Sequence, residues 1–156
     1  MSPRVLDAVG LVARLVLGVV LLVAGWLKVG DLTGSVQAVV AYELVGYELA
    51  RFIGVTLPVV EIAVGALLVL GLFTRASALV GTLLMLVFVA GIASAWTRGL
   101  AIDCGCFGDG GPVDPEDTRY LEEILRDIGL AVAGLWLVAR PHTLAAVDTL
   151  LRRGRT

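Results

Sequence analysis

The sequence predicts an all-α integral membrane protein, built as a bundle of four spanning helices. Of its 156 residues, 58% are hydrophobic and only 17% are charged, and the mean hydropathy is +0.95. A soluble domain of this size carries more charge on its surface. The apolar residues also form separate runs of about 20 residues, the length that crosses a hydrocarbon core about 30 Å thick. We expect one domain over residues 1–156, embedded in the lipid bilayer, and no nucleic-acid partner.

The first predicted span covers about residues 8–29. No small-residue cleavage site follows this run, but further apolar runs do, so we interpret it as a membrane helix rather than a signal peptide. Gly18 and Gly25 lie two turns apart on one face, where they would let a neighbouring helix approach closely. Arg14 lies near the starting end, and we expect its long side chain to reach the headgroups.

Three further segments follow before the cysteines. Residues 31–51 are less hydrophobic and contain tyrosines, which predicts a short helix in the membrane interface. The second and third predicted spans cover about residues 52–74 and 76–97. The second contains a single charged residue, Glu61, and the third contains none.

The fourth predicted span covers about residues 120–139 and ends before Pro141. Asp114 and Pro115 are typical of an N-cap and a first helical position, so we expect the helix itself to begin there. Its uncharged part, residues 128–139, crosses only about 18 Å at 1.5 Å per residue. The charged residues before this part must therefore face protein or water inside the bundle, or lie above the bilayer.

The distribution of basic residues predicts the orientation. More of them fall on the side of the two termini, which the positive-inside rule places in the cytoplasm. The tail, residues 141–156, is typical of a basic amphipathic segment on the cytoplasmic leaflet. We therefore expect a multi-pass protein of the cytoplasmic membrane, with the loop between the third and fourth spans on the outer side.

This loop contains the only two cysteines, Cys104 and Cys106, separated by Gly105. A disulfide between them would close a very small ring, and such a strained bond is easily reduced. Labile disulfides are more often catalytic or regulatory than structural, and so short a loop makes a poor staple. The predicted site is therefore a redox-active disulfide, with an inert structural pair as the alternative.

A metal site is the weaker alternative and no metal is expected. A closed zinc or iron site needs four ligands, and the single histidine, His142, lies on the other side of the membrane. Asp103 and Asp109 should raise the thiol pKa values, whereas ring strain favours an oxidising couple.

Glu61 is the second candidate, because an intramembrane carboxylate is costly and often functional. It lies roughly 13 Å into its span at 1.5 Å per residue. We expect Arg126 or Arg14 to be its partner, with Lys28 and Asp127 completing the polar candidates. A structural ion pair and a proton-handling or quinone-site role both stay open.

Several motifs are shared with a known family. They are Arg14-Leu-Val-Leu-Gly18, Ala24-Gly25-Trp-Leu-Lys28, Tyr42-Glu-Leu, Pro58-Val-Val-Glu61-Ile-Ala-Val-Gly65, Gly71-Leu-Phe-Thr-Arg75, Arg98-Gly-Leu-Ala-Ile-Asp103-Cys104-Gly105-Cys106-Phe107-Gly108 and Arg126-Asp127. With these motifs the chain resembles the MauE/DoxX family of redox-associated membrane proteins, in particular its methylamine-utilisation MauE-like branch. The cysteine motif is the most specific part, and Gly46, where the family pattern has a proline, departs from it. The resemblance implies a DoxX-like four-helix bundle. It also implies a role in disulfide formation or electron transfer outside the cytoplasm, with a thioredoxin-like partner.

The predicted function is that of a membrane thiol–disulfide redox protein. Cys104 and Cys106 would exchange electrons with an extracytoplasmic thioredoxin-like protein, or with a disulfide-containing substrate protein, and with the membrane quinone pool. Such a protein would be a thiol:quinone-type oxidoreductase. The alternative is a non-catalytic assembly or anchor subunit of a redox or dehydrogenase-maturation complex. A small-solute carrier is the weakest hypothesis, because no inverted repeat is visible.

Overall fold

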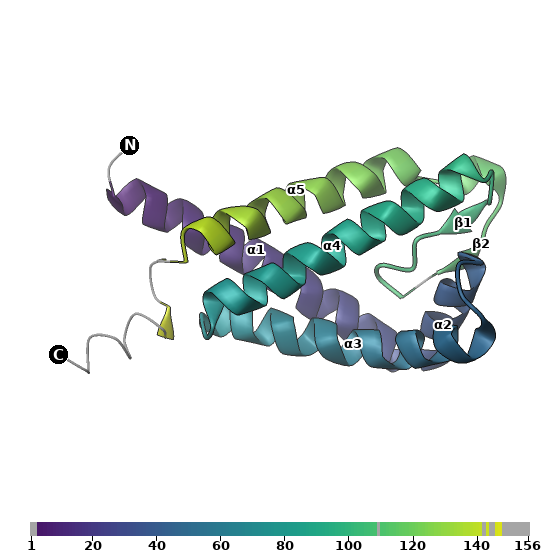
Figure 1. The fold of residues 1–156 in the computed structure, drawn as a ribbon, viewed down its shortest axis with the longest axis horizontal. Coiled ribbons are helices and arrows are strands. Elements are labelled where there is room, and N and C mark those ends of the chain that lie inside the picture. Colours follow the sequence, from purple (N-terminus) through teal and green to yellow (C-terminus); the bar gives the residue numbers. More distant parts are fainter. Residues whose placement is uncertain (1–2, 109, 142, 144–145, 148–156) are drawn as a thin grey trace.

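The computed structural model of the chain describes residues 3–108, 110–141, 143 and 146–147. Within them the structure confirms the predicted all-α bundle (Figure 1). The elements in chain order are α1 (Pro3–Gly30), α2 (Leu32–Ala41), α3 (Tyr47–Leu70), α4 (Thr74–Thr97), β1 (Ile102–Asp103), β2 (Gly111–Pro112), a 3-10 turn (Pro115–Asp117) and α5 (Tyr120–Ala139).

Three of the four predicted spans meet the requirements for crossing a membrane. In the part of the chain that the structure describes, α1, α3 and α4 are long and apolar enough to do so. The fourth, α5, coincides with the predicted residues 120–139 and packs along α4 and α1. Its early charged residues include Glu123 and Asp127, and both are buried against protein, as predicted.

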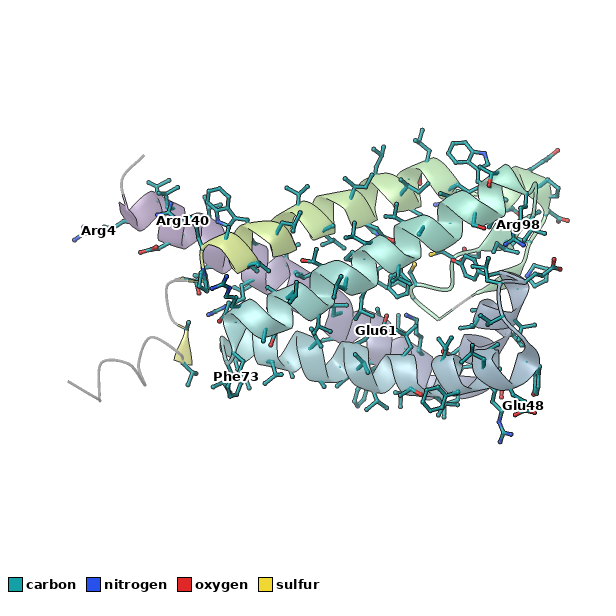
Figure 2. All side chains as sticks on the ribbon, in the orientation of Figure 1. Arg4, Glu48, Glu61, Phe73, Arg98 and Arg140 are labelled. Atoms are coloured by element: carbon teal, nitrogen blue, oxygen red, sulfur yellow. The ribbon has the colours of Figure 1, made fainter. Side chains whose placement is uncertain are left out.

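The helices form a bundle with two distinct ends. Figure 1 shows that α1 begins and α5 ends at one end, whereas α2 and the β1–β2 pair lie at the other. In Figure 2, Arg4 and Arg140 mark the first end, Arg98 and Glu48 mark the second, and Glu61 lies between them. The first residues of α1 and the last residues of α5 thus lie on the same side of the bundle.

A seam of small residues joins α1 to α3. A Cβ atom added to Gly25 would lie 2.7 Å from the carbonyl oxygen of Pro58. One added to Gly65 would lie 2.7 Å from the carbonyl oxygen of Gly18. The backbones therefore touch where a side chain would separate them, which confirms the close approach predicted from Gly18 and Gly25.

The helix boundaries depart from the predicted ones where turns intervene. α3 begins at Tyr47 rather than at residue 52, because the helix extends into the less hydrophobic segment directly after Gly46. It ends at Leu70, since Gly71 takes a left-handed conformation with φ of 68° and caps the helix. α4 then begins at Thr74, two residues before the predicted start.

The predicted helix start at Asp114 was wrong. Asp114 precedes only a 3-10 turn, Pro115–Asp117, and its side chain makes no capping hydrogen bond. Thr118 then adopts an extended conformation with φ of −68° and ψ of 130°, which interrupts the helix. The acidic proline-containing run therefore forms a turn of its own, and α5 begins at Tyr120.

Arg14 is buried inside the bundle, so the expectation that its side chain reaches the lipid headgroups was wrong. Its side chain is 2% exposed, and its Nη1 atom donates a hydrogen bond to Oγ1 of Thr143 at 3.0 Å. The same guanidinium occupies the space beside Gly71, so it lies where α3 ends. Of the predicted amphipathic tail, the structure describes only Pro141, Thr143, Ala146 and Val147. The remaining residues of the tail, His142 among them, lie outside the described residues.

Candidate functional site

The cysteines lie in a loop, residues 102–112, that β1 and β2 close. These strands pair antiparallel, with Ile102 opposite Pro112 and Asp103 opposite Gly111. The loop rests on α2. A Cβ atom at Gly105, whose φ is 66°, would lie 2.5 Å from Cβ of Ala38. Glycine is thus required here both for the left-handed conformation and for the contact with the helix.

Two tyrosines fix the backbone of the cysteine loop. Tyr42, at the end of α2, donates a hydrogen bond from its hydroxyl to the carbonyl oxygen of Cys104 at 3.0 Å. The hydroxyl of Tyr120 accepts a hydrogen bond from the Ile102 N–H at 3.0 Å and donates one to the carbonyl oxygen of Leu100. The loop is therefore held from α2 on one side and from the start of α5 on the other.

The two thiols lie next to each other and are both buried. Cys104 is 8% exposed and Cys106 is 6% exposed, and both are free thiols in this structure. The N–H of Cys106 donates a hydrogen bond to Sγ of Cys104 at 3.2 Å. The disulfide between them therefore stays a prediction, whereas their proximity is a feature of the fold.

The Cys106 thiol is held in its neutral form. Its hydrogen bond to the Cys104 side chain and its burial raise its pKa above the ordinary range, and the negative charge of Asp127 adds to the rise. From the sequence we expected Asp103 and Asp109 to raise the thiol pKa values, but the balance against ring strain was left open. The main causes are instead the neighbouring cysteine and the burial of the loop, and Asp109 lies outside the described residues.

An outer cavity of about 330 Å³ opens beside Cys104. Its lining includes Phe107 from the loop and Glu122, Glu123 and Arg126 from α5. Nη2 of Arg126 lies 3.9 Å from Sγ of Cys104, and its guanidinium lies over the ring of Phe107 at 4.9 Å. Of the two sulfurs, that of Cys104 therefore belongs to the residue that lines the outer cavity, and the Arg126 guanidinium lies beside it.

A group of possible ligand atoms lies at the same cavity. One carboxylate oxygen each of Asp103 and Glu123 and the sulfur of Cys104 all lie within 4.8 Å of one another. Three atoms are fewer than the four ligands of a closed zinc site, and the Arg126 guanidinium contacts the same sulfur. The expectation of no metal stays a prediction.

The partner of Glu61 is Lys28, and the predicted pairing with Arg126 or Arg14 was wrong. Nζ of Lys28 lies 2.6 Å from Oε1 of Glu61, and the two side chains are 3% and 0% exposed. Side chains on a helix lean toward its N-terminus, so Lys28 reaches back along α1 to the seam where Gly25 touches α3. Arg14 lies fourteen residues earlier on α1, roughly 21 Å away at 1.5 Å per residue.

Arg126 instead pairs with its neighbour in the chain. Its Nε atom donates a hydrogen bond to Oδ1 of Asp127 at 2.9 Å. An inner cavity of only about 10 Å³ lies on the other side of Arg126 and Phe107. Glu61, Cys106 and Asp127 all line this cavity, and Lys28 is bound to Glu61. The structure thus brings together all the predicted polar residues except Arg14, which lies against Thr143.

A comparison with protein families gives a match over nearly the whole chain. The model of the family described as methylamine utilisation protein MauE matches residues 6–140. The chain belongs to the MauE family. The search of curated proteins and the search of solved structures found no match. The matched region of this MauE-family protein contains every element from α2 to α5 and all the site residues described above, and the DoxX part of the resemblance stays a prediction.

Sequence reasoning did not single out Tyr42, Glu123 and Phe107 as site residues of this MauE-family chain. Tyr42 lies 62 residues from Cys104 in the sequence, and only the helix packing brings them together. Glu123 stood in a cluster of charged residues at the start of a helix, where a solvated face is the ordinary interpretation. Its position one turn before Asp127 on the same face of α5 was the available signal.

Proposed function

We propose that this MauE-family membrane protein is a thiol–disulfide redox protein that works through Cys104 and Cys106. The observation that carries the proposal is the asymmetry of two adjacent thiols. Cys104 lines an outer cavity and lies beside Arg126, whereas Cys106 faces an inner cavity lined by carboxylates. An attacking thiol needs access to one sulfur, and the other sulfur then leaves. The different surroundings of Cys104 and Cys106 support this division of roles.

In the disulfide form, a thiolate of the partner protein attacks Sγ of Cys104. The Cys104–Cys106 bond breaks, Cys106 leaves with the bonding electrons, and a mixed disulfide joins the partner to Cys104. A second partner thiol then attacks the partner's own sulfur and releases Cys104. Two electrons and two protons pass in total from the partner dithiol to the cysteine pair.

The reduced pair must then return two electrons and two protons to an acceptor. We propose a membrane quinone, which becomes a quinol, because the chain contains no second pair of cysteines. The inner cavity of about 10 Å³ has no room for a quinone ring, so the quinone would approach through the outer cavity of about 330 Å³.

The proposed partner is an extracytoplasmic thioredoxin-like protein or a disulfide-containing substrate protein, and the loop would lie outside the cytoplasm. A membrane-impermeant maleimide applied to reduced intact cells should then label the cysteines. Labelling only after the membrane is permeabilised would contradict this orientation.

One observation favours the alternative of a non-catalytic assembly subunit. Both cysteines pack into a small apolar cluster with Ile92, Ile102 and Tyr120, which is where a structural pair would lie. The alternative predicts that the thiols matter only for the shape of the loop.

Trapping separates the two functions. The Cys106→Ser variant keeps the accessible sulfur but lacks the resolving one, so it should accumulate a mixed disulfide with its partner, detected on a non-reducing gel. Cys104→Ser is the matched control, since its remaining sulfur faces inward, and it should trap far less. Full activity in a folded Cys104→Ser/Cys106→Ser variant would overturn the redox function and support the assembly subunit.

A further inference from the structure

The inner cavity has the size of one water molecule. Its volume of about 10 Å³ is close to the smallest space that holds a single water. The polar part of its lining is Glu61, Cys106, Arg126 and Asp127, and the rest is apolar. Phe107 and Arg126 line both this cavity and the outer one, and so form the partition between them.

Two carboxylate oxygens at this cavity have no partner among the described residues. They are Oε2 of Glu61 and Oδ2 of Asp127, and both side chains are at most 2% exposed. The other oxygen of each carboxylate is occupied, by Lys28 and by Arg126 respectively. A buried acceptor without a hydrogen bond is costly, and a water that bridges two of them removes that cost.

The charges around Cys106 are already balanced. Lys28 and Arg126 supply two positive charges, and Glu61 and Asp127 supply two negative ones. A thiolate on Cys106 would add a negative charge with no compensation inside the bundle, so a proton must follow it. The groups that face this region are Lys28 from α1, Tyr42 from α2, Glu61 from α3, the apolar Met85 and Phe88 from α4, Glu123, Arg126 and Asp127 from α5, and Cys104 and Asp103 from the loop.

We propose that one water in the inner cavity joins Glu61 to Asp127, and that this carboxylate–water unit supplies and removes the proton of Cys106. When the disulfide opens, Cys106 leaves with the electron pair and receives a proton that the unit has taken up from the outer cavity, so that Glu61 and Asp127 are both ionised again afterwards. When the disulfide forms again, the Cys106 thiol returns its proton to the unit as its sulfur attacks. Only a proton moves through the unit, so the electron count of the exchange is unchanged.

The proton is replaced from the outer cavity. Glu123 lines that cavity, lies one turn before Asp127 on α5, and also has an oxygen, Oε2, without a partner among the described residues. Because the partition of Phe107 and Arg126 separates the two cavities, the proton crosses by transfer between carboxylates rather than by the entry of solvent. This inference rests on the proposed redox function and assigns its proton path.

The test is single-turnover reduction of the disulfide by dithiothreitol, in full-length protein in nanodiscs. The reaction is stopped by alkylation and followed by mass spectrometry. Rates are divided by the concentration of dithiothreitol thiolate at each pH. The wild-type rate should then stay constant as the pH rises. The Asp127→Asn rate should be lower by about 100-fold and should fall as the pH rises, since the proton must then come from solvent.

Two further variants keep the test independent of folding. Ala24→Val fills the inner cavity without changing any carboxylate, and it should slow Cys106 release in the same way. Glu116→Gln removes an exposed carboxylate that lines neither cavity and should leave the rate and its pH profile unchanged. Thermal unfolding of each variant confirms that it is folded.

Wild-type rates and pH profiles in both Asp127→Asn and Ala24→Val would overturn the proton path and leave the redox function in place. If Asp127→Asn does not fold, Ala24→Val alone decides. A wild-type protein that exchanges no thiols at all would overturn the redox function, and the proton path with it.

Discussion

Two ion pairs in the part of the chain that the structure describes contain the same kinds of charge but are built differently. Lys28 and Glu61 come from different helices, lie 2.6 Å apart and are both nearly inaccessible, at 3% and 0% exposed. Arg126 and Asp127 are neighbours on one helix, 2.9 Å apart, and the arginine is 32% exposed while the aspartate is 2% exposed. One pair is sealed inside the bundle, and the other reaches the outer cavity through its cation.

This difference separates stability from reactivity. The Lys28–Glu61 pair joins α1 to α3 beside the close contact at Gly25. Removing either partner therefore leaves an unpaired charge buried between the two helices. The arginine of the second pair contacts Cys104 and Phe107 with the part of its guanidinium that Asp127 does not use. The sealed pair should therefore control folding, and the open pair should control thiol exchange.

The largest expected effect is the loss of stability in Lys28→Met. Glu61 would be left as an uncompensated buried charge, which should lower the free energy of unfolding by about 3–5 kcal/mol. The double variant Lys28→Met/Glu61→Leu should recover most of that loss, because an apolar pair needs no desolvation of charge. Unfolding in mixed detergent measures the free energy of unfolding of both variants. If Lys28→Met were as stable as the double variant, Glu61 would not be an uncompensated buried charge.

The seam that holds this pair should be the next most sensitive part. Gly25→Ala places a Cβ atom 2.7 Å from the carbonyl oxygen of Pro58, so the helices must separate, at a cost of about 1–3 kcal/mol. Gly129→Ala on α5 is the matched control, since nothing lies within 4 Å of an added Cβ there. It should be neutral or stabilising, by up to about 1 kcal/mol. Equal effects at the two glycines would show that the α1–α3 contact is not close in the membrane.

The open pair should respond in the opposite way. Arg126→Lys keeps a positive charge beside Asp127 but loses the planar group that reaches Cys104 and covers Phe107. Stability should change by less than about 1 kcal/mol, while the rate of thiol exchange should fall about tenfold. Arg119→Lys, in the same cavity, is the control and should exchange at the wild-type rate. A large loss of stability with unchanged exchange would reverse the roles assigned to the two pairs.

The smallest effect concerns the pH dependence of the two thiols. Because the pKa of Cys106 is raised, its thiol keeps its proton where an ordinary cysteine, with a pKa of about 8.5, loses it. The stability that this gives is complete below about pH 8.5 and is lost as the pH rises further. In the dithiol form, iodoacetamide should therefore modify Cys104 first, as peptide mass spectrometry of the two sites can show. Faster modification of Cys106 at neutral pH would contradict the inward position of that sulfur.

The sequence predicted correctly those structural features that depend on a single helix or loop. Apolar run length predicted α1, α3 and α4, and the spacing of Gly18 and Gly25 predicted the close helix contact. The position of the cysteines between the third and fourth spans predicted a loop at one end of the bundle. Each of these features follows from residues that are neighbours in the chain.

Features that depend on which helices face each other could not be predicted in this way. Depth alone made Arg126 as good a partner for Glu61 as Lys28, and only the packing of α1 on α3 decides between them. The contact of Tyr42 with Cys104 likewise depends on how α2 packs against the cysteine loop. The start of α5 was predicted at the wrong residue because Asp114 and Pro115 are as compatible with the start of a 3-10 turn as with the start of a longer helix.

Two tyrosines outside the cysteine loop hold its backbone in place, and this affects any synthetic peptide that copies the loop. A synthetic peptide covering residues 98–112 would contain both thiols and both strands, yet it would lack Ala38, Tyr42 and Tyr120. Such a peptide would lose the contact of Gly105 with Ala38 and the hydrogen bond from Tyr42 to the Cys104 carbonyl oxygen. Its thiols should behave like those of an unstructured dithiol, so antibodies, inhibitors or mimics of this loop would have to be raised against the whole bundle.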